Sequence, residues 1–311
     1  MITVNLDRLS QEQNKEFNII AQDIRADYNS LIVSLSEDHL DNIHWIVSSI
    51  ASRNKYYSPL FIRCCQITFV KQLLNQSNPV AKIVTKDRAL AIVLKKWCDD
   101  QKITGTTIQC SESTMTFVWR ILRPLRQYLI AIYFLSLRCL GSSFKAKRIL
   151  SDVPITLIDT FVLNNGGADE GSINNDGEYK DRYYPGLMEQ LTEEEKKNLF
   201  YLPTNVGFNN PIKAFRLIRS STSPFIIHDD YLKISDYFLA LKHPFKLLSC
   251  SLVNSEFRGV DIMPILVEER VNHCSDFASL LGILYHQFPL RLKEHGVKVR
   301  MVVEWYENQV I

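Results

Sequence analysis

A cluster of polar and aromatic residues near the end of the chain is the strongest candidate for chemistry. An apolar run over residues 297–303 leads directly into residues 304–309, which read EWYENQ. Ligands of open α/β sheets bind at the carboxyl ends of strands, and a carboxylate among aromatic rings can have a raised pKa and act as a general acid or base. We therefore expect Glu307 to be catalytic and Asn308 and Gln309 to orient the substrate. The alternative is a helix start with Glu307 near the helix dipole.

A second cluster lies at residues 180–186, which read KDRYYPG and follow a long turn-rich stretch. Adjacent Asp and Arg side chains between aromatic rings can orient a polyhydroxylated ligand through charge-assisted hydrogen bonds and a stacking face. We expect Asp181 to be catalytic and Lys180, Arg182 and Tyr184 to bind substrate, because loops after strong strands often carry sites. The alternative is a turn stabilised by a local Asp–Arg pair.

The third cluster opens a helix at residues 52–59, which read SRNKYYSP. Backbone N–H groups at a helix start attract anions, and Arg53, Asn54 and Ser58 could complete such a substrate site. The alternative is an ordinary helix cap with solvated charges.

The histidines offer weaker signals. Residues 228–230 (HDD) could form a metal or base cluster, but the two aspartates could equally cap the next helix. His273 has no suitably spaced partner, so we predict no metal site. The chain also lacks the P-loop, G-x-G-x-x-G, G-x-S-x-G and H-E-x-x-H patterns of common nucleotide-binding proteins, hydrolases and proteases.

The elements that must position these residues alternate between strands and helices, which favours parallel βαβ units. We predict one Rossmann-like α/β lobe over residues 1–296. The expected strands cover residues 30–35, 81–84, 106–110, 155–163, 200–203 and 297–303, and the expected helices cover residues 38–50, 59–74, 87–98, 211–219, 229–242 and 264–291.

A basic, apolar helical insertion interrupts this alternation near residues 111–150, which hold seven basic residues and a single acid. Its arginines Arg120, Arg123 and Arg126 suit a helix lying on a membrane, with the guanidinium groups near lipid phosphates. The alternative is a core helix whose arginines extend to water.

Composition excludes several classes of protein. The 311 residues are 46% hydrophobic, enough for one large or two medium domains, and the net charge of +2 argues against a nucleic-acid binder. No secretory signal or spanning segment is visible, and the seven cysteines follow no disulfide or zinc pattern. We expect a cytoplasmic protein, peripheral at the inner face of the cytoplasmic membrane.

Three segments together resemble a group of bacterial surface-carbohydrate biosynthesis proteins of glycosyltransferase type. They are SRN at 52–54 with SPLF at 58–61, KDRYYPGL at 180–187, and WYENQ at 305–309. The resemblance spans nearly the whole chain and implies a GT-B-like architecture of two Rossmann-type lobes, in which the N-terminal lobe holds the acceptor and the C-terminal lobe mainly holds the sugar nucleotide. This chain departs from that pattern because most or all of a second lobe is absent. We therefore expect residues 297–311 to be the final strand and the start of the missing lobe.

These features predict the acceptor-side lobe of a glycosyltransferase in lipopolysaccharide or capsule synthesis. A sugar nucleotide would be the donor substrate and a glycan or lipid-linked molecule the acceptor, without a covalently bound cofactor or a metal. Glu307 would be the base or a carboxylate that orients the sugar, with Arg53 and Arg182 contacting anionic or hydroxyl-rich groups. The main alternative is a non-catalytic α/β module that binds a glycan or a partner in a polysaccharide assembly system. A transferase of phosphate or acyl groups is a further alternative.

Overall fold

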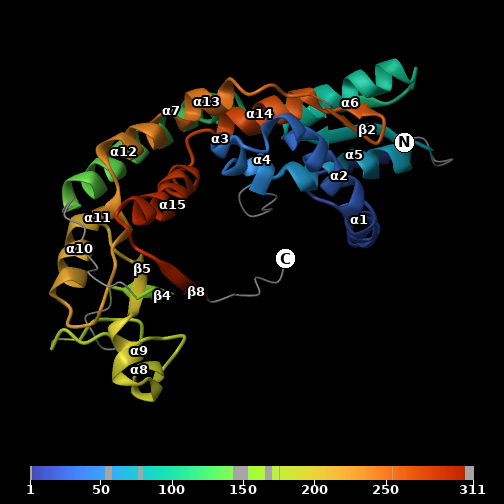
Figure 1. Ribbon diagram of the computed structural model, residues 1–311. Coiled ribbons are helices and arrows are strands. Elements are labelled where there is room, and N and C mark those ends of the chain that lie inside the picture. Colours follow the sequence, from blue (N-terminus) through green and yellow to red (C-terminus); the bar gives the residue numbers. More distant parts are fainter. Residues whose placement is uncertain are drawn as a thin grey trace. The chain divides into compact units, whose positions relative to one another are not determined.

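The computed structural model describes residues 2–52, 58–75, 80–142, 153–164, 170–174, 176–253 and 255–304. It has the predicted mixed α/β fold, with helices flanking short parallel sheets (Figure 1). Contacts between Cα atoms divide the chain into two compact units: unit 1 contains Met1–Leu129 and Lys242–Leu280, and unit 2 contains Ile130–Leu241 and Leu281–Ile311. The single lobe expected over residues 1–296 stays a prediction.

Unit 1 is organised around a parallel sheet of three strands in the order β1-β2-β3. The strands are β1 (Ile2–Asn5), β2 (Val80–Thr85) and β3 (Thr107–Cys110). The expected strands at 81–84 and 106–110 are confirmed, whereas β1 has no counterpart among the predictions. With four residues, β1 is too short to show a clear two-residue alternation.

Helices and one hairpin complete unit 1. The helices are α1 (Gln11–Asp23), α2 (Arg25–Ser36), α5 (Leu60–Asn75), α6 (Arg88–Asp100), α13 (His243–Leu248) and α14 (Met263–His273), with the hairpin strands β6 (Glu256–Phe257) and β7 (Val260–Asp261). The predicted helices at 59–74 and 87–98 are thereby confirmed as α5 and α6. Asp87 caps α6 by accepting a hydrogen bond from the backbone N–H of Leu90, 2.9 Å away.

The strand expected over residues 30–35 is wrong, because these residues lie inside α2. Buried Tyr28, Leu31, Ile32 and Leu35 recur at helical spacing, whereas Val33 is 55% exposed. The short β-branched run at 32–33 suggested a strand, but the longer helical pattern that starts before it decides the local structure.

The helix expected over residues 38–50 is broken into η1 (Glu37–His39), α3 (Ile43–Ile46) and α4 (Ser49–Ser52). Asn42 has an extended backbone, and its side chain accepts a hydrogen bond from the N–H of His44, which begins a new helix at α3. Such local side-chain-to-backbone bonds compete with continuation of a helix.

Apolar side chains from the sheet and its helices form one continuous core in unit 1. Among its fully buried members are Ile83 on β2, Val70 on α5 and Leu94 on α6. Leu266 on α14 joins the same cluster, so α14 is tied to the sheet although it lies far along the chain. This core holds α5, α6 and α14 in place around the polar groups that they carry.

Unit 2 contains a second parallel sheet, in the order β5-β4-β8. Its strands are β4 (Ile155–Leu163), β5 (Leu199–Val206) and β8 (Val299–Val303), so β4 is central as predicted. The strands expected at 200–203 and 297–303 are also confirmed, with β8 beginning two residues later than expected. The helices that lie wholly in unit 2 are α8 (Leu187–Gln190), α9 (Glu193–Lys197), α10 (Pro211–Ser220), α11 (His228–Tyr231) and α12 (Ile234–Leu241).

The single helix expected over residues 229–242 is wrong in its continuity, since α11 ends at Tyr231 and α12 begins at Ile234. The carboxylate of Asp236 accepts a hydrogen bond from the backbone N–H of Lys233, 2.8 Å away, which starts α12 afresh. The helical stretch expected over 264–291 is likewise divided, into α14 and α15 (Phe277–Glu294).

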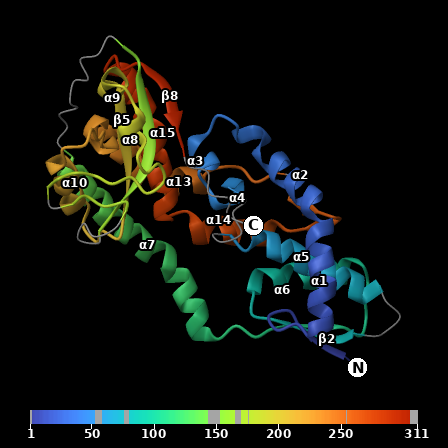
Figure 2. The same cartoon turned by 90° about the horizontal axis from the view of Figure 1, so that it is seen from below.

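Within the predicted insertion, residues 114–141 form one continuous helix, α7 (Thr114–Gly141), of 28 residues (Figure 2). Pro124 lies inside it, and the boundary between the two units falls between Leu129 and Ile130. Among the helices of the described residues, none is long and apolar enough to cross a membrane.

Candidate functional site

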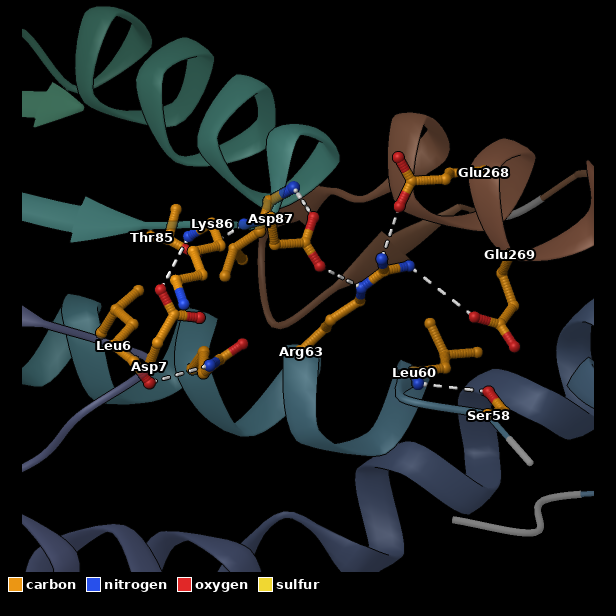
Figure 3. Close-up of polar contacts among 12 residues, drawn as sticks. Leu6, Asp7, Ser58, Leu60, Arg63, Thr85, Lys86, Asp87, Glu268 and Glu269 are labelled. Carbon is orange, nitrogen blue, oxygen red and sulfur yellow. Dashed lines mark hydrogen bonds and ion pairs between the residues drawn. The ribbon is translucent and has the colours of Figure 1, made fainter. Parts of the chain in front are cut away.

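Carboxylates gather at the carboxyl edge of the unit 1 sheet. Asp7, Asp87 and Glu112 each lie two residues beyond the last residue of β1, β2 and β3. Because the strands are parallel, these positions share the edge at which α/β proteins bind their ligands. Asp7 fixes the loop after β2, since its carboxylate accepts a hydrogen bond from the backbone N–H of Lys86 at 2.7 Å (Figure 3).

Arg63, in the first turn of α5, connects this edge to α14. Its Nε donates to Asp87 at 2.6 Å, its Nη2 donates to Glu268 at 2.5 Å, and its Nη1 lies 3.7 Å from Glu269 (Figure 3). Arg63 is only 6% exposed and Glu269 only 1% exposed. Charged side chains are rarely buried to this degree unless they are paired or functional.

Arg120 on α7 extends the same network. Its guanidinium group bridges Glu112, 3.1 Å away, and Glu268. The ring of Phe117 packs beneath it and also contacts the guanidinium group of Arg88, with ring-centroid distances of 5.5 and 4.7 Å. The α7 arginine is thus fixed by protein carboxylates from two elements.

A pocket of about 570 Å³ opens beside these ion pairs. This volume suits a small organic ligand. Trp119 contributes an aromatic face that is 60% exposed, and Asn272 contributes an amide. The pocket is lined by Pro59, Arg63, Thr116, Trp119, Arg120, Arg123, Glu268, Glu269, Asn272 and His273, all within unit 1.

Three buried polar atoms of the lining residues have no hydrogen-bond partner among the described residues. They are Nη1 of Arg63, Nε of Arg120 and Oε1 of Glu269. An unpaired buried polar group costs about 1–3 kcal/mol, and more when it is charged. The set contains two donors and one acceptor, so a ligand that both donates and accepts hydrogen bonds can satisfy all three.

The charge balance of the pocket indicates which ligand fits. The lining holds three arginines and two glutamates, and two further carboxylates outside the lining, Asp87 and Glu112, pair with Arg63 and Arg120. The ion-pair network as a whole therefore has a formal charge of −1, and a multiply charged anion gains little from the local field. A neutral, hydroxyl-rich molecule can use the donors and acceptors without that opposition, and its apolar face can pack on Trp119. The charged members of this network are Arg63, Arg120, Arg123, Glu268 and Glu269 in the lining, with Asp87 and Glu112 outside it.

The predicted helix-start cluster borders this pocket at its described end. The hydroxyl of Ser58 is buried and accepts a hydrogen bond from the backbone N–H of Leu60 at 3.1 Å, so it caps α5. The next residue, Pro59, lines the pocket. Arg53 and Asn54, the other predicted members, lie outside the described residues.

The predicted cluster at residues 180–186 belongs to unit 2. Asp181 is buried, and its carboxylate accepts hydrogen bonds from the backbone N–H groups of Tyr183 and Tyr184 and from the Thr160 hydroxyl, at 2.8, 2.9 and 3.1 Å. This carboxylate organises the turn through the backbone and Thr160, whereas the alternative expected a local Asp–Arg pair. Lys180 and Arg182 are exposed, whereas Tyr184 packs against the apolar cluster of unit 2.

The predicted cluster at the end of the chain is described only as far as Glu304; Glu307, Asn308 and Gln309 lie outside the described residues. Glu304 follows β8 and continues the register that pairs Ile158 with Val303, which sets it beside Asp159 on β4. Burial and then the Glu304 carboxylate raise the pKa of Asp159 to about 6, although a hydrogen bond from the backbone of Thr160 opposes this. The sequence argument overlooked Asp159.

The three predicted membrane arginines separate in the structure. Arg120 is held by Glu112 and Glu268, whereas Arg123 and Arg126 are exposed. Arg123 forms no ion pair with the described residues and lines the pocket. Their contact with a membrane stays a prediction.

Residues 228–230 form a core assembly in unit 2. Asp229 is bound by the Arg138 guanidinium group, at 3.0 and 2.6 Å, and by the Tyr237 hydroxyl, at 2.8 Å. Burial and then the Arg138 charge lower the pKa of His228 to about 3, which keeps this imidazole neutral. No group of three or more metal-ligating side chains occurs in the described part of the chain.

Several pocket residues were not assigned to a site from the sequence, among them Arg63, Glu268, Glu269 and His273. The signal for Arg63 was available, because it shares the buried face of α5 with Leu60, Cys64 and Ile67. A lone arginine at helical spacing among apolar residues indicates a buried ion pair or a site. The statement that His273 has no suitably spaced partner is wrong, since Glu269 and Asp276 are neighbours at helical distances along the chain.

The chain was compared with protein families, curated proteins and solved structures. No family model, no curated protein and no solved structure matches it.

Proposed function

We propose that unit 1 binds a neutral saccharide in the Arg63–Arg120 pocket, and that the protein is a glycosyltransferase for which this saccharide is the acceptor. The observation that carries the proposal is the set of unpaired donors and acceptors on Arg63, Arg120 and Glu269 beside an exposed tryptophan. A sugar ring offers hydroxyl groups to the former and an apolar face to the latter.

The fold supports the same proposal. Two arginines of the pocket, Arg63 and Arg120, pair with Asp87 and Glu112, which follow β2 and β3 at the carboxyl edge of a parallel α/β sheet, the edge where such folds bind small molecules. In the resemblance to bacterial surface-carbohydrate biosynthesis proteins, the N-terminal GT-B lobe is the acceptor side. The transferred sugar would come from a sugar nucleotide, and the product would belong to lipopolysaccharide or capsule.

The second candidate function is saccharide binding without transfer. It rests on the same pocket and requires no donor. The resemblance to transferases favours the enzyme, and turnover of a donor separates the two candidates.

The test is release of nucleoside diphosphate from a panel of sugar nucleotides, with and without neutral oligosaccharide acceptors, by the full chain. Trp119→Ala removes the aromatic face, and Leu125→Ala is the matched control because these side chains, 60% and 58% exposed, share α7. We expect acceptor-dependent release, a KM for the acceptor raised about tenfold or more by Trp119→Ala, as expected for lost stacking, and no change in the control.

The outcomes separate the candidates. Absence of release with every donor and acceptor would contradict the transferase. If saccharide binding still depended on Trp119 in that case, the second candidate function, saccharide binding without transfer, would be supported.

We also propose that α7 brings the protein to the inner face of the cytoplasmic membrane. Its exposed apolar side chains accompany the exposed arginines Arg123 and Arg126, a combination that suits an anionic lipid surface. The apolar members are Met115, Val118, Ile121, Leu122, Leu125 and Leu129.

Sedimentation with phosphatidylglycerol vesicles tests this membrane proposal. We expect the chain to sediment with them, and Arg126→Gln together with Ile121→Ser to lose most of this binding. Arg120 and Arg123 stay unchanged in that variant, so the pocket is preserved. Equal sedimentation of the variant and the original chain would contradict membrane contact by α7.

A further inference from the structure

His273 lines the pocket, and one nitrogen of its imidazole ring is bound to a carboxylate. It is the last residue of α14 and is 6% exposed. Its Nδ1 lies 2.7 Å from a carboxylate oxygen of Asp276, and its Nε2 lies 3.6 Å from Oε1 of Glu269. The first distance is a hydrogen bond and the second is longer than one.

Asp276 is itself held in place. Its other carboxylate oxygen accepts a hydrogen bond from the side-chain amide of Gln127 on α7, 3.2 Å away. Its backbone carbonyl accepts from the N–H groups of Ser279 and Leu280, at 3.0 and 3.3 Å, at the start of α15. An ionised carboxylate only accepts, so the neutral His273 ring carries its proton on Nδ1 and its lone pair on Nε2.

Two carboxylates lie on either side of the His273 ring. An imidazolium ion at His273 would lie between two carboxylates, those of Asp276 and Glu269, which stabilise its charge. Arg63 lies on the far side of Glu269, where its Nη1 contacts the other carboxylate oxygen. The arrangement matches the nucleophile-activating dyads of hydrolytic enzymes, in which a carboxylate fixes the histidine tautomer.

The remaining charged groups around this dyad come from several elements. Arg120 and Arg123 on α7 line the same pocket, and Glu268 precedes Glu269 on α14. On α13, burial and then His44 lower the pKa of His243 to about 4, while the Asp276 charge opposes them. His243 is therefore neutral near pH 7 and does not compete with His273 for the charge of Asp276.

We propose that His273 is the general base for a hydroxyl group bound in the Arg63–Arg120 pocket, and that Asp276 is its positioning residue; this rests on the proposed transfer reaction. The acceptor hydroxyl gives its proton to Nε2 of His273 as its oxygen forms a bond to the anomeric carbon of the donor sugar. The bond from that carbon to the nucleoside diphosphate breaks, and the diphosphate leaves with the electron pair. Glu269 contacts the imidazolium ion that results.

Kinetics of the full chain test this assignment, with a sugar nucleotide and a neutral oligosaccharide as substrates. We expect His273→Gln to lower kcat about 10²–10⁴-fold with little change in the KM of the acceptor, as for loss of a general base. Asp276→Asn should lower kcat less and displace the acidic limb of the pH profile, which reports the general base. His286→Gln is the matched control, since this histidine is exposed and lies in unit 2.

The kinetic outcomes are distinct. If the original chain transfers sugar and the His273→Gln variant keeps the same kcat and pH profile, the assignment of His273 as the base is overturned. The assignment of the protein as a transferase would stand. An original chain without transfer would overturn the transferase, and the base with it.

A second measurement does not depend on turnover. Nitrogen-15 NMR of the histidine-labelled chain reports which ring nitrogen carries the proton, and the signals missing from His273→Gln identify this residue. We expect the Nδ1–H tautomer at neutral to mildly basic pH, and its loss in Asp276→Asn. An Nε2–H tautomer, or an imidazolium ion across that whole range, would overturn the base.

Discussion

Each unit contains a buried arginine–carboxylate assembly, and the two differ in whether all their buried polar atoms have hydrogen-bond partners. This difference distinguishes a structural ion pair from a candidate binding site. In unit 2, Arg138 and Asp229 bond each other twice, Tyr237 adds a third hydrogen bond to the carboxylate, and no buried side-chain atom described for Arg138 or Asp229 lacks a partner. In unit 1, the pairing around Arg63 leaves its Nη1 and Oε1 of Glu269 without hydrogen bonds.

The comparison teaches that burial of a charge is not by itself a sign of a site. Both arginines are less than 10% exposed. The Arg138 pair is closed and ties α7 to α11 and α12 within the core. The Arg63 network borders a pocket and keeps unused hydrogen-bonding capacity, which only a ligand or water can satisfy.

The largest expected effect is on stability and comes from removing one partner of the Arg138–Asp229 pair. Asp229→Ala leaves the Arg138 charge buried without its partner and should lower the free energy of unfolding by about 3–5 kcal/mol. Chemical denaturation followed by circular dichroism measures this. Asp230→Ala is the matched control, because the neighbouring carboxylate pairs with Arg219, which is about a third exposed. A loss below about 1 kcal/mol for Asp229→Ala would contradict a structural role for the pair.

In the Arg63 network of unit 1, we expect a smaller effect on stability than for Asp229→Ala and a larger effect on binding. Glu269→Gln keeps the shape of the side chain and breaks no hydrogen bond that the described residues make to Oε1. We expect it to change the free energy of unfolding by less than about 1 kcal/mol and to weaken saccharide binding about tenfold. Calorimetric titration and denaturation of the same samples measure both. The reverse pattern, unchanged binding with severe destabilisation, would make this network structural as well.

The third expected effect concerns Asp159, a carboxylate whose pKa is raised by burial and then by a neighbouring like charge. Its pKa is about 6 in the fold against 3.8 without it, so folding favours the protonated form. This contribution to stability is fully present below pH 3.8 and is lost as the pH rises through 6. Asp159→Asn should therefore stabilise the protein by about 1–2 kcal/mol at pH 7.5, allowing for solvent screening of a half-buried group.

The pH dependence of that variant is the check. The difference in unfolding free energy between Asp159→Asn and the original chain should shrink towards zero near pH 4. Glu304→Gln removes only the second cause and should give a smaller gain of the same sign. A difference that is independent of pH would contradict the raised pKa.

The sequence specified the regular elements better than their ends. The central strand β4 has the predicted bounds, because nine consecutive residues show a strong apolar, β-branched pattern between polar stretches. The strand expected at 30–35 failed since a six-residue window hides the helical spacing that begins at Tyr28. The break at Asn42 depends on one side chain bonding the backbone, which periodicity does not report.

The candidate site was harder to predict, because it is assembled from distant parts of the chain. Arg120 and Arg123 were singled out for a membrane, and Ser58 and its neighbour Pro59 for an anion, yet all lie in or beside one pocket. Only the packing of α14 against α5 and α6 brings Glu268 and Glu269 to Arg63, more than 200 residues away in the chain. Single-sequence patterns report local structure and cannot show such pairings.

The most direct test of the central claim is saturation-transfer NMR of the full chain with a neutral oligosaccharide panel and a matched sugar-phosphate panel, at low and high salt. We predict binding of neutral saccharides that is insensitive to salt, lost in Trp119→Ala and kept in Leu125→Ala. Binding confined to the sugar phosphates and weakened by salt, or neutral binding unaffected by Trp119→Ala, would contradict a saccharide site in this pocket.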